Sequence, residues 1–181
     1  GQFTLGGPAG EVKVECLDND IVRVDMGTPV FDPEKVPVDL EPVDGWYRLD
    51  IQHQHFRLGA VSMGNPHALV LVDGSSSAEI TNLGAAISSN PVFPQGCNAG
   101  FAEITDRNNI HLRVFERGAA ETSACGSGAC AAVSILRRAN MVDETVRVTQ
   151  RGGDLTIRWT GGRGSVIMAG PATYVYKGIF E

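Results

Sequence analysis

The chain has 181 residues, which fits one domain, or one domain and part of a second, at about 100 to 200 residues per domain. Hydrophobic residues make up 43% and charged residues 20%, a composition that excludes an intrinsically disordered chain. The net charge is −6 and the longest basic cluster is Arg137-Arg138, so nucleic acid is not an expected partner. A membrane is not expected either, because no stretch approaches the roughly 18 apolar residues of a spanning helix.

The reactive side chains narrow the chemistry further. Only three lysines are present, Lys13, Lys35 and Lys177, which leaves few candidates for a Schiff base to a carbonyl substrate or to pyridoxal phosphate. The four cysteines show neither the spacing of a secreted disulfide framework nor a Cys-x-x-Cys pattern, so we predict a reduced, cytoplasmic compartment and no metal site. These cysteines are Cys16, Cys97, Cys125 and Cys130.

The first half of the chain is predicted to be mostly β-structure. Apolar and charged residues alternate over 12–16, turn-forming residues follow, and apolar residues resume over 21–24, which predicts a β-hairpin. Residues 29–42 carry four prolines and predict an extended connection into a second structural unit. Further strands are predicted at residues 46–51, 55–63, 68–73, 99–105 and 110–115.

Two segments have helical rather than β patterns. Ile80, Leu83 and Ile87 fall on one helical face, which predicts an amphipathic surface helix over 78–89. Residues 127–139 are apolar on nearly every side and end in two arginines, which predicts a buried helix with cations at its C-terminal end. Strands are predicted after it at residues 145–150, 155–159, 165–168 and 173–180.

A cysteine flanked by glycine precedes the buried helix, in the run Ala-Cys-Gly-Ser-Gly over residues 124–128. The first-turn amides of a helix carry about half a positive charge, which predicts a partly exposed Cys125 with a pKa below its free value of about 8.5. The same amides can hold a carboxylate, because Gly126 and Gly128 allow close backbone approach and Ser127 supplies a hydroxyl. The alternative is that Cys125 only packs in a tight turn.

A second polar cluster is Gly64-Asn65-Pro66-His67, which lies between two predicted strands. Asparagine before proline favours a rigid, extended turn that projects its amide, and a neighbouring histidine is able to relay protons. The alternative is an Asx turn with a solvated histidine.

Together these segments resemble diaminopimelate epimerase, a family of pyridoxal-independent enzymes of lysine and peptidoglycan-precursor synthesis. The likeness covers essentially the whole chain. Ala120 and Ser127 stand where the family usually has glycine and threonine. The landmarks, in the family's order, are Gly64-Asn65-Pro66-His67, Asn98-Ala99-Gly100, Glu116-Arg117-Gly118 and the segment 124–131.

The resemblance implies an α+β fold, with a mixed, barrel-like, strand-rich sheet wrapped around a central apolar helix. It implies that residues 26–170 form the family's second domain. Residues 1–25 then correspond to remnant strands of the first domain, and 171–181 to a terminal strand that returns to it. The family's first catalytic cysteine lies in a Cys-Gly-Asn-Gly-Ala-Arg segment that has no counterpart in this sequence.

The same resemblance implies roles for individual residues. Cys125 corresponds to one of two catalytic cysteines that interconvert LL- and meso-diaminopimelate without a cofactor, and His67 and Glu116 would tune the thiols. Tyr176 corresponds to the family's dimer-contact tyrosine, so a homodimer is expected for the parent enzyme. The residues that line the substrate site would be Asn65, Asn98, Glu116, Arg117, Gly126 and Ser127.

Two other functions remain open at this point. One is a proline or hydroxyproline racemase of the same fold, although these relatives lack the Glu-Arg-Gly run at residues 116–118. The other is an isolated half-domain that binds a ligand or partner without catalysis. Because α-carbon inversion needs an acid and a base on opposite faces, we expect the 181-residue chain alone not to epimerise diaminopimelate.

Overall fold

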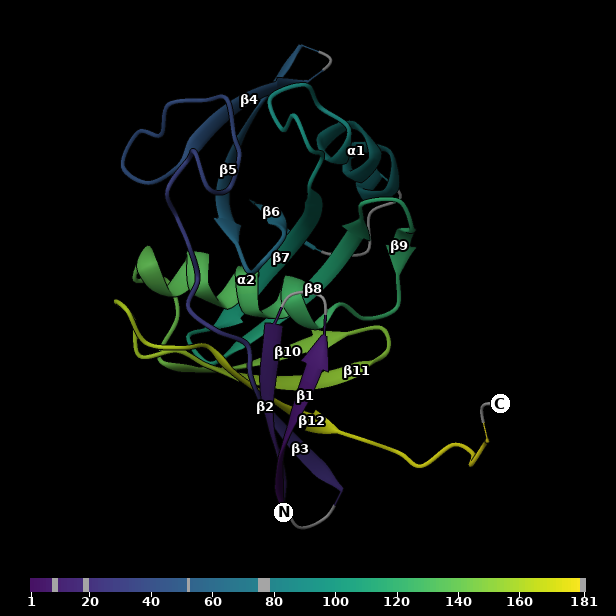
Figure 1. Cartoon of the computed structure of the whole chain (residues 1–181). Helices are drawn as coiled ribbons and strands as arrows, with labels where there is room; N and C mark the ends of the chain where they lie inside the picture. Colours follow the sequence, from purple (N-terminus) through teal and green to yellow (C-terminus); the bar gives the residue numbers. More distant parts are fainter. Residues whose placement is uncertain (8–9, 18–19, 52, 75–78, 180–181) are drawn as a thin grey trace.

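The computed structural model describes residues 1–7, 10–17, 20–51, 53–74 and 79–179, and these form an α+β fold (Figure 1). Within them, twelve strands build one mixed sheet and two helices pack on it. The strands are β1 (Gln2–Gly7), β2 (Gly10–Cys16), β3 (Ile21–Asp25), β4 (Tyr47–Ile51), β5 (Gln54–Ser62), β6 (Pro66–Leu71), β7 (Asn98–Asp106), β8 (Asn109–Glu116), β9 (Ala120–Thr122), β10 (Thr145–Gln150), β11 (Gly153–Arg158) and β12 (Ile167–Pro171), and the helices are α1 (Glu79–Ser88) and α2 (Gly126–Arg138).

The strand order is β1-β2-β3-β12-β11-β10-β8-β7-β6-β5-β4, with β9 paired to β8 off this path. Most neighbours are antiparallel, but β6 with β7 and β8 with β10 are parallel. Parallel neighbours require a crossover connection, and α1 and α2 lie on these two crossovers. The pairing of β3 with β12 joins residues 21–25 to residues 167–171. Segments from the two ends of the chain therefore lie side by side.

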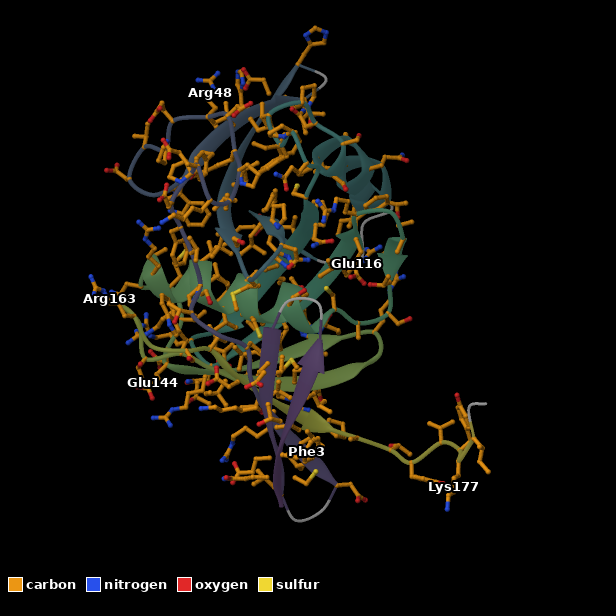
Figure 2. All side chains as sticks on the ribbon, in the orientation of Figure 1. Phe3, Arg48, Glu116, Glu144, Arg163 and Lys177 are labelled. Atoms are coloured by element: carbon orange, nitrogen blue, oxygen red, sulfur yellow. The ribbon has the colours of Figure 1, made fainter. Side chains whose placement is uncertain are left out.

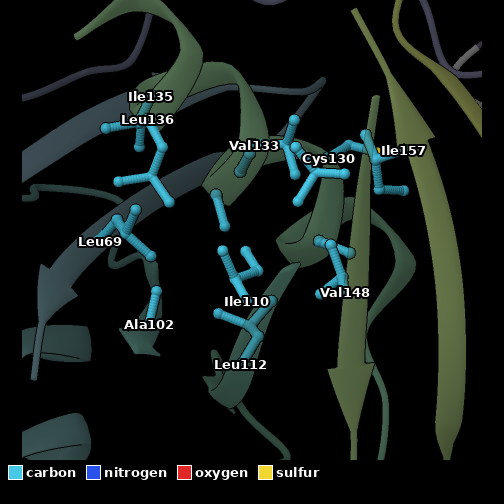
Figure 3. Close-up of a cluster of buried hydrophobic side chains, with 14 of the residues drawn as sticks. Leu69, Ala102, Ile110, Leu112, Cys130, Val133, Ile135, Leu136, Val148 and Ile157 are labelled. Atoms are coloured by element: carbon cyan, nitrogen blue, oxygen red, sulfur yellow. The ribbon is translucent and has the colours of Figure 1, made fainter. Parts of the chain in front are cut away.

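The main core lies between α2 and the sheet that curls around it, as the sequence predicted. α2 packs against β5, β6, β7, β8, β11 and β12, and the residues from Gly128 to Leu136 are buried. Gly59 on β5 makes this packing possible, because a Cβ there would lie 2.3 Å from Cγ2 of Ile135. Figure 3 shows Val133 and Leu136 of the helix among side chains from several strands, including Ile110 and Val148.

A second core covers the opposite face of part of the sheet, under α1. β7 supplies both cores by alternation, since Phe101 belongs to this cluster and Ala102 to the cluster around α2. Gly84 brings α1 close to β8, because a Cβ at this position would lie 2.6 Å from the Cβ of Phe115. This contact supports the end of β8, where Glu116 lies.

The predicted elements occur in the predicted order, with boundary shifts of a few residues, but β1 and β9 were not predicted. The predicted terminal strand over 173–180 is wrong for residues 173–179, which leave the sheet after Pro171 and have no strand structure (Figure 1). Alternating Tyr and Val residues favour a strand, but a strand also needs a neighbour to pair with, and these side chains are exposed. Phe180 lies outside the described residues, as does Ala78 of the predicted first helix.

Candidate active site

Cys125 lies immediately before α2, with an extended backbone (φ −139°, ψ 109°). Its side chain is only 5% exposed, so the predicted partial exposure is wrong. The thiol points inward into space that Gly128 leaves open. A Cβ on Gly128 would lie 3.2 Å from the sulfur and 3.0 Å from Cγ2 of Val114.

The sulfur of Cys125 is held by polar groups from two elements. Its S–H donates to Oε2 of Glu116 at 3.3 Å, and the Ser127 hydroxyl lies 3.6 Å away. The other carboxylate oxygen of Glu116 accepts a hydrogen bond from the Thr122 hydroxyl at 2.6 Å. β8 and β9 therefore fix a carboxylate against the thiol; Figure 2 labels Glu116 at this position beside β9.

Burial raises the pKa of the Cys125 thiol above its ordinary value. The Ser127 hydroxyl and the Gly128 amide act in the opposite direction, and the Glu116 carboxylate raises the pKa because it accepts the S–H. The predicted lowering of this pKa is therefore wrong in this chain: desolvation outweighs the helix N-terminus, which contributes through the Gly128 amide. Near neutral pH the sulfur is a thiol that donates to a carboxylate.

The second predicted cluster lies where β6 runs parallel to β7. His67 and Asn98 are partners in this pairing, and Nε2 of His67 lies 3.0 Å from Oδ1 of Asn65. The Asn98 amide donates to the Pro66 carbonyl at 3.4 Å, and its Oδ1 accepts the Arg117 backbone N–H at 2.9 Å. Asn98 thus ties the Asn65–His67 turn to the residue next to Glu116, so the two predicted clusters meet in one place.

His67 is buried, with 2% of its surface exposed, so the alternative of a solvated histidine is wrong. Burial, with a smaller contribution from the Arg117 charge, lowers its pKa from 6.5 to about 4. The imidazole is therefore neutral near neutral pH. It has no hydrogen bond to Cys125 within the described structure, whereas Glu116 does.

The remaining predicted site residues differ in how closely they join this cluster. The Arg117 guanidinium donates to the Gln95 carbonyl at 2.5 Å and is exposed beyond it. Gly126 and Ser127 form the first turn of α2, whose amides have no partners within the helix. Tyr176 is 73% exposed in the segment after β12 and has no hydrogen bond to the site in the part of the chain that is described.

Sequence reasoning missed Gln150, the last residue of β10. Its buried carboxamide accepts the Cys125 N–H at 2.8 Å and donates to the Cys125 carbonyl at 3.5 Å. The signal was the alternation of β10, where Val146, Val148 and Gln150 are buried and share one face. A polar residue in a buried series needs a hydrogen-bonding partner, and here that partner is the backbone of the cysteine.

Neither a metal cluster nor a membrane span is found in the described residues. Across these ranges, no three His, Cys, Asp or Glu side chains are arranged to hold a metal ion. No helix among them has the length and apolar character needed to cross a bilayer. A cavity of about 430 Å³ lies between β1, β2, β3 and β12, and its lining includes none of the site residues.

Residues 59–175, which include the site just described, match the family profile of diaminopimelate epimerase. The chain belongs to the diaminopimelate epimerase family. A diaminopimelate epimerase of Xanthomonas axonopodis pv. citri (strain 306) is 43% identical over 178 residues, which cover 98% of this chain and 63% of that protein. An O-ureido-serine racemase of Streptomyces lavendulae is 42% identical over 181 residues, 99% of this chain and 63% of that protein. The chain thus spans 63% of the length of these two relatives.

A solved structure outside the close relatives has the same fold. A hydroxyproline epimerase from Agrobacterium vitis, with bound trans-4-OH-L-proline, superposes with a TM-score of 0.68 over 96% of this chain and 57% of its own, at 18% identity. At this identity the likeness concerns the fold alone, and it confirms the α+β class expected from the sequence.

Proposed function

We propose that the protein containing this chain is a cofactor-independent diaminopimelate epimerase, in which Cys125 is one of two acid–base groups. The observation that carries the proposal is the hydrogen bond from the Cys125 thiol to the Glu116 carboxylate, at the start of a buried helix, in a member of this family. A thiol suits this work because its ordinary pKa lies near the pH at which such enzymes operate.

Inversion of an α-carbon removes a proton from one face and delivers another proton to the opposite face. As the acid, Cys125 gives its S–H proton to the α-carbanion and becomes a thiolate, which the Gly128 amide and the Ser127 hydroxyl stabilise. As the base, it first passes its proton to the Glu116 carboxylate, and the resulting thiolate takes the α-proton. The opposite-face group would come from outside these 181 residues, which is consistent with the 63% share of the relatives' length.

The substrate would be held beside the thiol by the remaining donors. The free first-turn amides of Gly126 and Ser127 suit the α-carboxylate, as helix N-termini bind anions. Asn65 lies on the neighbouring turn and Asn98 at the start of β7, and Arg117 has further guanidinium donors beyond its bond to Gln95 for the distal end of the substrate.

The division into domains, the dimer and the compartment are also proposals. We assign residues 26–170 to the family's second domain, and residues 1–25 and 171–181 to its first. The exposed Tyr176, with its exposed neighbours, supports a role in a homodimer contact. The four free cysteines support a reduced, cytoplasmic compartment.

A second candidate is racemisation of a different amino acid. The O-ureido-serine racemase is 42% identical, against 43% for the Xanthomonas diaminopimelate epimerase, so overall identity does not separate the two substrates. Proline or hydroxyproline racemisation has only the support of a shared fold at 18% identity. Turnover of each amino acid by the same preparation separates the three candidates.

The test uses the full-length protein and LL-diaminopimelate in heavy water. We expect meso-diaminopimelate to form with solvent deuterium at the inverted carbon, and Cys125→Ala to abolish its formation. Cys16→Ser is the matched control, because Cys16 is exposed on β2, and it should keep wild-type turnover. Turnover of O-ureido-serine or proline but not of diaminopimelate would reject the proposal, as would full activity of Cys125→Ala.

A further inference from the structure

The turn between β10 and β11 is bonded to the loop that leads into Cys125. A Cβ on Gly152 in this turn would lie 3.1 Å from both the Ala124 Cβ and the Ser123 carbonyl oxygen, so the two segments are in direct contact. Residues 150–152, which end β10 and begin the turn, bond to residues of β9 and of the loop that follows it. The contacts are Gln150 to the Cys125 backbone at 2.8 Å, Arg151 to Glu121 at 3.2 Å, and the Gly152 N–H to the Ser123 carbonyl at 2.7 Å.

Gln150 makes the central contact of this set, and it bonds both backbone groups of Cys125. Oε1 accepts the Cys125 N–H and Nε2 donates to the Cys125 carbonyl, which also accepts the first helical hydrogen bond, from Ala129 at 3.0 Å. Cys125 is the N-cap of α2 but supplies no side-chain cap. Cysteine is not among the preferred N-cap residues. Here the backbone at the start of the helix is held by Gln150, the last residue of β10.

A fixed backbone at Cys125 determines where its sulfur points. With the residue held extended, Sγ faces the Glu116 carboxylate and the Gly128 amide, and the thiol stays buried. Gln150 accepts the Cys125 N–H. The next two amides, those of Gly126 and Ser127, have no hydrogen bond among the described residues and remain free donors at the start of the helix.

We propose that Gln150 is a positioning residue for Cys125: its carboxamide holds the cysteine backbone so that the sulfur stays buried against Glu116. Any effect of Gln150 on turnover rests on the proposed function. The positioning itself is measured by the reactivity of the Cys125 thiol, which does not require turnover. None of the predicted site residues supplies this contact, which joins residues 25 positions apart in the chain.

The experiment measures alkylation of Cys125 by iodoacetamide as a function of pH in the intact protein, with peptide mass spectrometry as the readout. Gln150→Met keeps the size of the side chain and removes both hydrogen bonds. Thr149→Val is the matched control, because it removes a hydrogen bond from the neighbouring residue of β10, to Asp154, that does not touch the cysteine loop.

We expect Gln150→Met to speed Cys125 alkylation by about fivefold, the factor that corresponds to losing one ordinary hydrogen bond. The pH midpoint should fall towards the ordinary thiol value, because burial is what raises the pKa in the wild type. Thr149→Val should stay within about twofold of wild type, since it leaves both bonds from Gln150 to the Cys125 backbone in place. Cys97 and Cys130 stay unlabelled, which shows that the fold is intact.

Wild-type kinetics and an unchanged midpoint in Gln150→Met would overturn the proposal. Equal acceleration in Thr149→Val would overturn it too, because the effect would then be general loosening of the hairpin. Hydrogen exchange on the unaltered protein gives a decision even if Gln150→Met does not fold: the Cys125 amide must exchange far more slowly than the exposed amides around Ser123. Loss of turnover in Cys125→Ala tests the proposed function separately and leaves this inference unaffected.

Discussion

Burial of His67 makes the stability of the fold depend on pH. The imidazole is 2% exposed, and its pKa is lowered from 6.5 to about 4, chiefly by burial. In the unfolded chain the ordinary pKa returns, so the unfolded state binds more protons in the window between these values. The contribution is therefore fully present above about pH 6.5 and is lost as the pH falls towards 4.

The size of this pH dependence of stability follows from the shift in the His67 pKa. Lowering the pH from 7 to 5 should cost about 2 kcal/mol of unfolding free energy, and the full loss at still lower pH is about 3 kcal/mol. Urea denaturation at the two pH values measures it, with His67→Gln as the comparison, because glutamine cannot titrate and keeps a donor for Asn65. Groups that titrate in both proteins cancel in this comparison.

His111→Gln is the control, since His111 is exposed on β8 and its replacement should leave the wild-type pH dependence in place. The reasoning is refuted if wild type and His67→Gln lose the same free energy between pH 7 and pH 5. Such a result would mean that the folded protein accepts a proton on His67 as easily as the unfolded chain does.

Three further predictions concern packing, charge and reactivity. Gly59→Ala should destabilise the fold by about 1 to 3 kcal/mol in thermal unfolding, through overpacking against Ile135, and the cost should shrink in an Ile135→Ala background. Arg113→Leu should cost about 1 to 3 kcal/mol in urea denaturation, because Glu121 loses its nearest cation at 2.6 Å and keeps the Arg151 guanidinium at 3.2 Å, and Glu121→Leu added to it should restore part of the loss. Cys97, whose pKa burial raises to about 12, should resist iodoacetamide at pH 8 in the folded protein; rapid labelling there would contradict its burial.

Local patterns were enough to predict the central helix, and the family resemblance then named the residues of the candidate site. α2 is apolar on nearly all sides and ends in two arginines, and both features lie within a stretch of 13 residues. The landmark residues Glu116, Cys125 and Ser127 do meet around one sulfur. Patterns of this kind work because the residues that decide the outcome are neighbours in the chain.

The failures arose where distant residues decide the outcome. The pKa of Cys125 is raised by burial in a core cluster to which Val114 and Val148 also belong, and that burial outweighs the helix N-terminus. The alternative of a solvated His67, which the local sequence left open, is wrong because its burial comes from other elements of the fold. The segment 173–179 has strand-forming residues but no strand to pair with, and pairing is a property of the whole sheet.

The pairing of β3 with β12 also has a consequence for how the chain folds. These strands join residues 21–25 to residues 167–171, so β3 is synthesised well before the strand with which it pairs. Until β12 emerges from the ribosome, β3 lacks one of its neighbours in the folded sheet, where it lies between β2 and β12. Contacts this distant in sequence slow folding, since a long loop must close before they form. We therefore expect docking of β3 onto β12 to be a late step, completed only after synthesis passes residue 171.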